Sequence, residues 1–403
     1  MDFNDTPEEA TFREEARTWL EQNIPSRDEL KGLDEIERAK LWQKRKYDAG
    51  WACIRWPKEY GGRDASAIEQ VILNQEESKF DIPTGVFGIG QGMAAPTLMA
   101  WAADEHKERY LPRLASGEDI WCQLFSEPAG GSDLAALRTR AEKDGDEWVI
   151  NGQKIWTSGA QYSDYGIIVV RTDPTVAKHK GLSYFFLDMK SPGIEIKPIK
   201  QISGGANFNE VYFTDVRIPD NQRMGAVGQG WQVAITTLMN ERASIGGGGG
   251  GVGFSQVFEL AQRVTIDDKP AIEDRSVRAK LATWYAQESG LRFTGYRSMS
   301  ALSRGDTPGP ENSIGKLVGA SKTQDMASFA MDLLDMAGAI SDPQLSEASG
   351  LYQASFMGSP GGRIAGGSDE IMLNILAERV LGMPQDVRLD KGIPFNEVPT
   401  GSN

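Results

Sequence analysis

Residues Trp121–Ser158 read WCQLFSEPAGGSDLAALRTRAEKDGDEWVINGQKIWTS, and within this stretch the chain changes from helical to strand-like patterns. Glu147–Ile150 and Gln153–Trp156 are apolar-rich runs joined by Asn151-Gly152. Because Asn-Gly suits a type I′ turn, the sequence predicts a β-hairpin centred on these two residues. Further strand-like runs follow at Tyr165–Arg171, Tyr184–Asp188, Ile194–Ile199 and Glu210–Ile218. The middle of the chain is therefore predicted to be a β domain.

Helical patterns flank this β region on both sides. Thr6-Pro7-Glu8-Glu9 is a capping box with proline at the first helical position, and a second periodic segment covers about residues 34–49, where Gly50 stops it. Long helical segments return after Trp231, and Gly/Pro-rich breaks are expected at 304–310, 341–343 and 358–362. This order predicts an α+β fold with three domains, over residues 1–119, 120–228 and 229–403.

Composition narrows the class of function. The 403 residues are 40% hydrophobic and 25% charged, which is typical of a soluble protein, and the apolar runs are too short to span a bilayer. The net charge of −14 argues against nucleic acid or an anionic membrane as a partner. The acidic N-terminus does not resemble a signal peptide, and two cysteines fit a reducing compartment, so a cytoplasmic location is expected. With two histidines, neither a His-based triad nor a zinc site is supported.

Two motifs in the opening stretch carry chemical possibilities. Leu124–Asp133 is rich in glycine and holds Ser126 and Ser132, so its backbone can approach a ligand closely. Taken alone, it is explained equally well by a loop with a helix cap. Lys154–Ser158 places a tryptophan beside two hydroxyls, which suits a flat aromatic ring with polar edges, although a buried strand tryptophan is the alternative. The chemistry is therefore expected to depend on carboxylates and a bound cofactor.

Together these two motifs and their spacing resemble the acyl-CoA dehydrogenase family. Asn207–Pro219, Gly366–Met372 and Ala377–Gly382 extend the resemblance to nearly the whole chain. It implies an N-terminal helical domain, a central β-barrel-like domain and a C-terminal four-helix bundle. It also implies FAD between the last two domains, an acyl-CoA substrate, and an electron transfer flavoprotein as the electron acceptor. Members of the family form dimers or tetramers.

The resemblance also implies which residues line the flavin and the substrate. Those matched to the FAD site are Gln123, Phe125, Ser126, Gly131, Ser132, Trp156, Thr157, Ser158, Ser368 and Glu370. Ser132 is expected to lie near the CoA thioester as well. Gln123 and Phe125 differ from the residues that are commoner at their positions.

The catalytic base requires a separate argument. Many members place a glutamate in a Tyr-Glu-Gly-Thr sequence, but the matching Ala365–Ser368 puts Gly366 there, and glycine has only its backbone N–H to offer the thioester carbonyl. A minority place the base on the first helix of the C-terminal bundle, where Leu238–Ala243 supplies Glu241. Without the family context, Glu241 and the following Arg242 would be interpreted as a solvated ion pair. We predict Glu241 as the base and Arg242 as a substrate contact.

Asp369 and Glu370 are the rival carboxylates for this role, although their matching positions face the cofactor in the family.

Two segments depart from the family pattern. Gly246–Gly251 falls where relatives have a helix, and it either disrupts that helix or makes room for a bulky, branched or steroid-like acyl group. Gln262–Pro270 lacks the Arg-x-x-Phe-Gly that reaches a neighbouring subunit's FAD in relatives, and Arg263 is a candidate substitute. This absence resembles members that work as mixed assemblies.

Three functions stay open at this stage. The first is an acyl-CoA dehydrogenase that passes electrons to an electron transfer flavoprotein. The second is a flavin oxidase on the same fold, reoxidised by oxygen. The third is a non-catalytic subunit that completes a partner's site, against which the presence of Glu241 argues.

Overall fold

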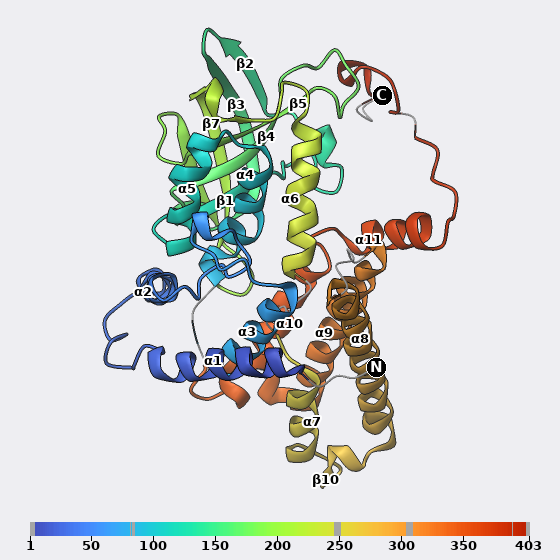
Figure 1. The fold of residues 1–403 in the computed structure, drawn as a ribbon. Coiled ribbons are helices and arrows are strands. Elements are labelled where there is room, and N and C mark those ends of the chain that lie inside the picture. Colours follow the sequence, from blue (N-terminus) through green and yellow to red (C-terminus); the bar gives the residue numbers. More distant parts are fainter. Residues whose placement is uncertain are drawn as a thin grey trace. The chain divides into compact units, whose positions relative to one another are not determined.

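The computed structural model of the protein describes residues 5–80, 82, 85–245, 251–303, 309–388 and 390–399 (Figure 1). The chain forms two compact units. The first contains Met1–Lys200, Ala206–Ser244 and Arg388–Asn403, and the second contains Gln201–Gly205 and Ile245–Val387. Among the described helices, none has the length and apolar character needed to cross a membrane. The domain limits at residues 119 and 228 stay predictions.

Within the described residues of the first unit, five α-helices precede the sheet. They are α1 (Pro7–Asn23), α2 (Glu35–Asp48), α3 (Ala67–Glu77), α4 (Ala95–Trp101) and α5 (Asp104–Ser116). The predicted capping box is confirmed, because Thr6 Oγ1 accepts from the Glu9 N–H at 3.2 Å and Glu9 Oε2 accepts from the Thr6 N–H at 2.7 Å. The predicted end of the second helix is confirmed as well, with Gly50 at φ +72 just beyond it.

Eight strands form one sheet in the described part of this unit. Their bounds are β1 (Trp121–Leu124), β2 (Arg140–Asp144), β3 (Glu147–Ser158), β4 (Tyr165–Arg171), β5 (Leu182–Asp188), β6 (Ile194–Ile199), β7 (Phe208–Pro219) and β8 (Arg223–Met224). The strand order is β6-β7-β3-β2-β4-β5-β8, and β1 pairs with β4 in parallel. All four runs predicted downstream of the hairpin are confirmed as β4, β5, β6 and β7.

The central strands are buried on both faces, which explains their continuous apolar sequence. In β4, Ile167 and Val169 lie in one core and Ile168 and Val170 in the other, and all four are 0% exposed. The first core is shared with α4, α5 and α6 (Gly230–Ile245), which lie beside the sheet in Figure 1. The second core is shared with β3 and β7. The sheet therefore folds over onto itself around this second core.

The hairpin predicted at Asn151-Gly152 is wrong. β3 runs unbroken through these residues, and the tight turn lies earlier, where Asp144 pairs with Glu147 across Gly145-Asp146. Gly145 has φ +60, the sign that the first central position of a type II′ turn requires.

Asn151 and Gly152 instead form an irregularity between β3 and β7. Asn151 exchanges two hydrogen bonds of 3.0 Å with Asp215, which itself has φ +50, and the register shifts between Ile150 and Gly152. A Cβ at Gly152, where φ is +150, would lie 2.5 Å from Thr139 Oγ1. Asn151 and Gly152 therefore mark a β-bulge. Glycine is common in bulges as well as in tight turns.

The described residues of the second unit are mainly helical. The α-helices are α7 (Phe254–Arg263), α8 (Arg275–Ser303), α9 (Ser313–Leu334), α10 (Leu351–Gly362) and α11 (Asp369–Ile375). The breaks predicted at 304–310 and 341–343 fall between helices, although 304–308 lies outside the described residues. The break predicted at 358–362 is wrong, because α10 continues to Gly362 with Pro360 inside it. Pro360 has no N–H to donate to the Phe356 carbonyl, but the helix ends two residues later, so this loss is confined to its last turn.

Candidate active site

A buried ion pair holds the loop that follows β1. Lys154 Nζ lies 2.8 Å from Glu127 Oε1 and donates to the Phe125 carbonyl at 3.0 Å. The Glu127 carboxylate also accepts the N–H groups of Arg138 at 2.6 Å and Thr139 at 2.9 Å. Burial would raise the pKa of the Glu127 carboxyl, but Lys154 and these donors outweigh it, so the pKa lies below its usual value. The Glu127 carboxylate is therefore charged at neutral pH, whereas burial lowers the pKa of Lys154 against the attraction of Glu127.

The same loop closes on itself and on β3. The N–H of Glu127 donates to the Gly130 carbonyl at 2.9 Å, and the Gly130 N–H donates back at 3.0 Å. The Ile155 N–H donates to the Ser126 carbonyl at 2.9 Å. Ser126 is half-buried, and the exposed Gly131 and Ser132 follow directly after this fixed turn. The sequence motif alone did not single out Glu127 or Lys154, although a lysine inside a strand was the available signal.

Trp156 stands outside the strand ladder near the end of β3. Its φ is +59, and the pairing of β3 with β7 shifts register between Lys154 and Thr157. The indole is 55% exposed, and Phe208 contacts it edge-to-face at a centroid distance of 6.1 Å. The alternative of a buried strand tryptophan therefore does not hold. A large residue held at positive φ is strained, and strain of this kind is concentrated at binding sites.

The next two residues along β3 both carry hydroxyl groups. Thr157 is 1% exposed, and its Oγ1 is without a hydrogen-bond partner within the described part of the chain. Ser158 is half-buried and pairs with Phe208 of β7. A buried hydroxyl without a partner costs free energy unless a ligand or water satisfies it, so Thr157 points to a bound polar group.

Phe125 and Gln123 differ in what they present. The Phe125 side chain is 4% exposed and packs edge-to-face on Tyr184 at 5.9 Å, so its side chain belongs to the core and only its backbone is left for a ligand. Gln123 on β1 is half-buried, and its Nε2 donates to Glu241 Oε2 at 3.3 Å. The structure thus brings a predicted FAD residue and the predicted base together.

Glu241 is carried by α6, and hydroxyl contacts fix that helix one turn earlier. Thr237 Oγ1 lies 2.9 Å from Thr97 Oγ1 and 2.9 Å from the hydroxyl of Tyr184. Because residues four apart share a helix face, these contacts set the face on which Glu241 lies. Glu241 is half-buried. The side chain of Arg242 and residues Gly246–Gly250 fall outside the described part of the structure.

The C-terminal site residues lie in the second unit, around the start of α11. Gly366 and Gly367 have φ +66 and +94, and Ser368 caps the helix by accepting from the Ile371 N–H at 3.4 Å. Glu370 is exposed, and its pKa is lowered by hydrogen bonds from its own backbone N–H and from Ser368. Since φ is positive at position 366, a glutamate there would be strained.

The rival carboxylate Asp369 has a different environment. It is 8% exposed, with Arg363 Nε 2.6 Å from its Oδ2 and Lys316 Nζ 3.7 Å from its Oδ1. Lys316 also donates to the Gly367 carbonyl. Two cations therefore hold this carboxylate, which suits a structural role better than proton transfer.

The segment that departs from the family pattern forms a small hairpin. β9 (Thr265–Ile266) pairs with β10 (Lys269–Pro270), and Asp267 and Asp268 between them have φ +49 and +61. This is the backbone of a type I′ turn. Arg263 just before it pairs with Glu347 at 2.9 Å. The candidate substitute for the missing arginine is therefore engaged within its own chain.

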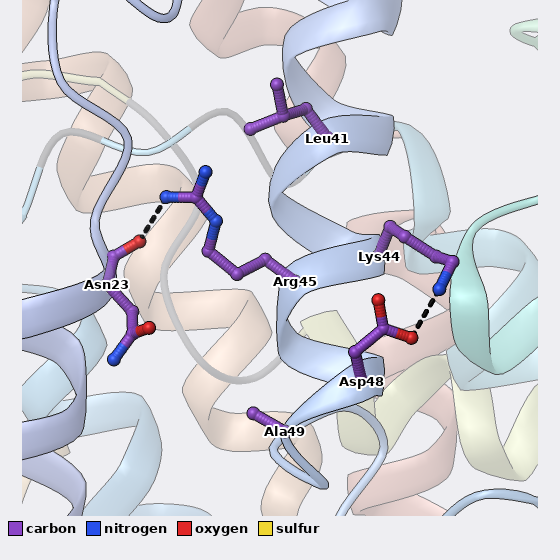
Figure 2. A pocket seen from close by; sticks show the side chains of 6 residues that line it. All are labelled: Asn23, Leu41, Lys44, Arg45, Asp48 and Ala49. Carbon is purple, nitrogen blue, oxygen red and sulfur yellow. Dashed lines mark hydrogen bonds and ion pairs between the residues drawn. The ribbon is translucent and has the colours of Figure 1, made fainter.

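Two surface pockets lie within the described structure, and neither is lined by the predicted site residues. Figure 2 shows one of about 430 Å³ beside α2, where Arg45 donates to the Asn23 carbonyl at 2.7 Å and Lys44 pairs with Asp48. The second, of about 600 Å³, lies in the second unit and is lined by residues of α8, α9 and α10 with Ile202 and Arg363. Each charge around the first pocket has a partner, since Lys44 pairs with Asp48 and Arg45 with Glu29, so this pocket offers no functional argument.

Comparison with known proteins identifies the class. Models of the N-terminal, middle and C-terminal domains of acyl-CoA dehydrogenases match residues 6–118, 122–216 and 228–381. Acyl-CoA dehydrogenase IpdE1 from Mycobacterium tuberculosis is 36% identical over 395 residues, which cover 94% of this chain and 98% of that protein. The chain belongs to the acyl-CoA dehydrogenase family. It is an enzyme of that type, as the sequence predicted.

Two solved structures are similar to this protein over nearly the whole chain. The Tcur3481-Tcur3483 steroid ACAD has a TM-score of 0.80 and 30% identity, over 96% of this chain and all of that one. The ChsE4-ChsE5 complex from Mycobacterium tuberculosis has a TM-score of 0.78 and 28% identity, with the same coverage. These similarities and the three domain models confirm the predicted helical, β and helical domains of the family fold.

Acyl-CoA dehydrogenases depend on FAD, and the residues of this chain fit that group. The exposed Trp156 offers an aromatic face, and Thr157 beside it holds the unsatisfied hydroxyl. The exposed Gly131 and Ser132 leave backbone N–H groups open to a ligand. Within the described residues, no group of three or more His, Cys, Asp or Glu side chains is placed to hold a metal ion.

Proposed function

We propose that this acyl-CoA dehydrogenase introduces an α,β double bond into an acyl-CoA thioester and that Glu241 removes the α-proton. FAD, when bound, supplies the acceptor for the β-hydride. The supporting observation is the hydrogen bond of 3.3 Å from Gln123 Nε2 to Glu241 Oε2, which joins the carboxylate to a strand of the predicted cofactor site. At the position where many relatives carry the base, this chain has Gly366 at φ +66.

The proton transfer sets demands on the site. A thioester α-proton is a weak acid, so the carbonyl must be polarised by fixed donors while the carboxylate takes the proton. We assign the backbone N–H of Gly366 and the cation of Arg242 to the thioester end. The Gln123 amide donates to one carboxylate oxygen of Glu241 and so helps to orient the carboxylate that takes the proton.

Binding of FAD is assigned to the residues that the family resemblance matches to the cofactor. In the first unit, Trp156 offers its indole face, and Thr157 and Ser158 offer hydroxyls. Gln123 and Ser126 lie on the connected β1 segment, Phe125 contributes through its backbone, and Gly131 and Ser132 contribute exposed N–H groups. Ser368 and Glu370 at the start of α11 are assigned to FAD on the family resemblance.

A steroid-like acyl group is the proposed substrate class. The support is the similarity to a protein described as a steroid ACAD, at 30% identity over 96% of this chain. The Gly246–Gly251 run follows Glu241 in sequence, and its lack of side chains suits a bulky acyl group. Residues 246–250 of this run lie outside the described residues.

A hetero-oligomer and an electron transfer flavoprotein are the proposed partners. Two similar solved structures are complexes of two different chains by name, ChsE4-ChsE5 and Tcur3481-Tcur3483. Arg263 is paired with Glu347 of its own chain, which agrees with a flavin site that a different subunit helps to complete. The electron acceptor is proposed from the family resemblance.

The test is anaerobic reduction of the flavin in the purified protein. The reduction is monitored as loss of the flavin's visible absorbance. Short, long, branched and steroid-like acyl-CoAs are compared at equal concentration. We expect bleaching to be at least tenfold faster with the steroid-like thioester, and reoxidation to be faster with an electron transfer flavoprotein than with oxygen. Bleaching by none of them, from protein that holds FAD, would refute the proposed reaction. Rapid reoxidation of the flavin by oxygen would support the oxidase. If the protein binds no FAD in the absence of a partner subunit, the partner-completed site is supported instead.

A further inference from the structure

The C-terminal segment lies along the loop that joins β4 to β5 in the first unit. We call residues 390–398 the C-terminal strap. The Phe395 N–H donates to the Val176 carbonyl at 2.9 Å, and Pro394 forms a β-bridge with Ala177. Backbone contacts therefore fix the register of the strap on this loop.

Lys178 connects the strap to the glycine-rich loop. Its Nζ lies 3.0 and 2.9 Å from the two carboxylate oxygens of Asp133, and it also pairs with Asp390. The Lys178 side chain is 5% exposed, so its charge depends on these partners. Asp133 follows Ser132 directly. Hydrogen bonds from Lys178 and Arg388 hold the pKa of Asp390 well below its usual range, so the contact is a charged one at neutral pH.

Arg171 makes a second connection between the same two segments. Its guanidinium donates to the carbonyls of Ala135 at 2.7 Å, Leu137 at 3.1 Å and Lys178 at 3.0 Å. The ring of Phe395 covers the guanidinium, with its centroid 3.4 Å from Cζ. Burial lowers the pKa of Arg171 to about 10, which leaves it charged at neutral pH. Phe395 thus shields a cation whose donors are directed at the loop.

We infer that the C-terminal strap positions the glycine-rich loop, which follows β1 and carries Ser132. Asp390 and Phe395 hold Lys178 and Arg171, and these two cations hold residues 133–137, so that Ser132 is presented in one conformation. Gly130, Gly131 and Ser132 are at least partly exposed, and two of them are glycines. Ordering such residues when a ligand binds costs conformational entropy, and a loop that is already held in place avoids part of this cost. The inference rests on the proposed function only for the role of Ser132, which the family resemblance places near both FAD and the CoA thioester.

The first experiment measures backbone amide exchange in the full-length protein without ligand. Asp390→Asn and Phe395→Ala are compared with Glu397→Gln, an exposed position on the same strap. We expect exchange in residues 131–137 to rise at least tenfold in the first two variants, with β4 and β5 unchanged, and to stay at the wild-type rate in the control. Phe395→Tyr should restore it. Unchanged exchange, or equal acceleration throughout the first unit, would overturn the inference.

The second experiment separates binding from chemistry. With the acyl-CoA that bleaches the wild type fastest, Asp390→Asn and Phe395→Ala should raise KM about fivefold or more and leave kcat within a factor of two. A fall in kcat with KM unchanged, or no change in either, would overturn the role of the strap in presenting Ser132. If the wild type oxidises no acyl-CoA, the proposed function fails on its own, while amide exchange still decides whether the strap orders the loop.

Discussion

The ammonium of Lys154 lies 2.8 Å from the carboxylate of Glu127, and both side chains are nearly inaccessible to water, at 0% and 6% exposure. The pair connects β3, which carries Trp156, with the loop that carries Ser132. Removing two charges from water costs several kcal/mol each, which their mutual attraction only approximately offsets. The main effect of the Lys154–Glu127 pair is therefore to fix the position of the loop relative to β3.

Lys154→Met should destabilise the apoprotein by about 3–5 kcal/mol, because it leaves the Glu127 carboxylate buried without its cation. Urea unfolding followed by tryptophan fluorescence measures this change. The double variant Lys154→Met/Glu127→Leu removes both charges and should be less destabilised than Lys154→Met alone. If the double variant loses the sum of the two single losses, the pair is not coupled in this way.

Trp156→Gly should weaken FAD binding at least tenfold while changing the stability of the apoprotein by less than about 1 kcal/mol. The indole is 55% exposed and φ is +59, so glycine relieves strain and little buried surface is lost. Trp148 on the same strand is the matched control. It is 4% exposed and donates to Asp220 at 2.6 Å, so Trp148→Ala should cost about 3–5 kcal/mol. Flavin titration and urea unfolding separate the two effects, and equal stability losses would contradict the contrast.

Much of the fold follows from local patterns. The Thr6 capping box and the strands β4 to β7 are recognisable because caps and alternating or continuous apolar runs are local signals. The hairpin at Asn151-Gly152 failed because the same dipeptide also suits a bulge, and the choice depends on Asp215, a partner 64 residues away. The break at Pro360 failed because tolerance of proline depends on how near the helix end lies.

The candidate site divides in the same way. The glycine-rich loop and the tryptophan motif are visible in the sequence, but the exposure of Trp156 depends on a register shift against β7 that no local pattern announces. The contact between Gln123 and Glu241 joins β1 to α6 across 118 residues. Likewise, the strap contacts of Lys178 and Arg171 depend on a C-terminal segment that carries no motif.

Glu76 should make stability depend on pH in the acid range. Its side chain is 1% exposed; burial would raise its pKa, but Arg17, Lys79 and Arg13 outweigh burial and lower it to about 2. The unfolded value is about 4.3, so the stabilisation is complete above that pH and is lost as the pH falls toward 2. The free-energy difference between wild type and Glu76→Gln should therefore shrink by about 2 kcal/mol from pH 7 to pH 3. Glu14→Gln, 70% exposed on α1, should change stability by less than about 0.5 kcal/mol at either pH.

Gly152→Ala should destabilise the protein by about 1–3 kcal/mol, because a Cβ there would lie 2.5 Å from Thr139 Oγ1 and φ is +150. Gly290 on α8 is the control, since it is exposed and a Cβ there meets no atom within 4 Å. Gly290→Ala should stabilise by about 0.5–1 kcal/mol through helix propensity. Thermal unfolding of both variants checks the pair, and a neutral Gly152→Ala would show that the bulge can relax.

Glu241→Gln should lower the rate of anaerobic flavin reduction by about a thousandfold or more, because the amide has no basic oxygen to accept the α-proton. The substitution preserves shape, so FAD content and acyl-CoA affinity should stay within about twofold of the wild type. The control is Glu378→Gln, which changes a half-buried glutamate whose carboxylate accepts from Gln385, and this variant should reduce its flavin at the wild-type rate. Glu370→Gln tests the rival carboxylate Glu370. This variant should bind FAD more weakly, but the flavin that remains bound should be reduced at a rate close to that of the wild type. A Glu241→Gln protein that bleaches normally, together with an inactive Glu370→Gln protein, would transfer the role of the base to the second unit.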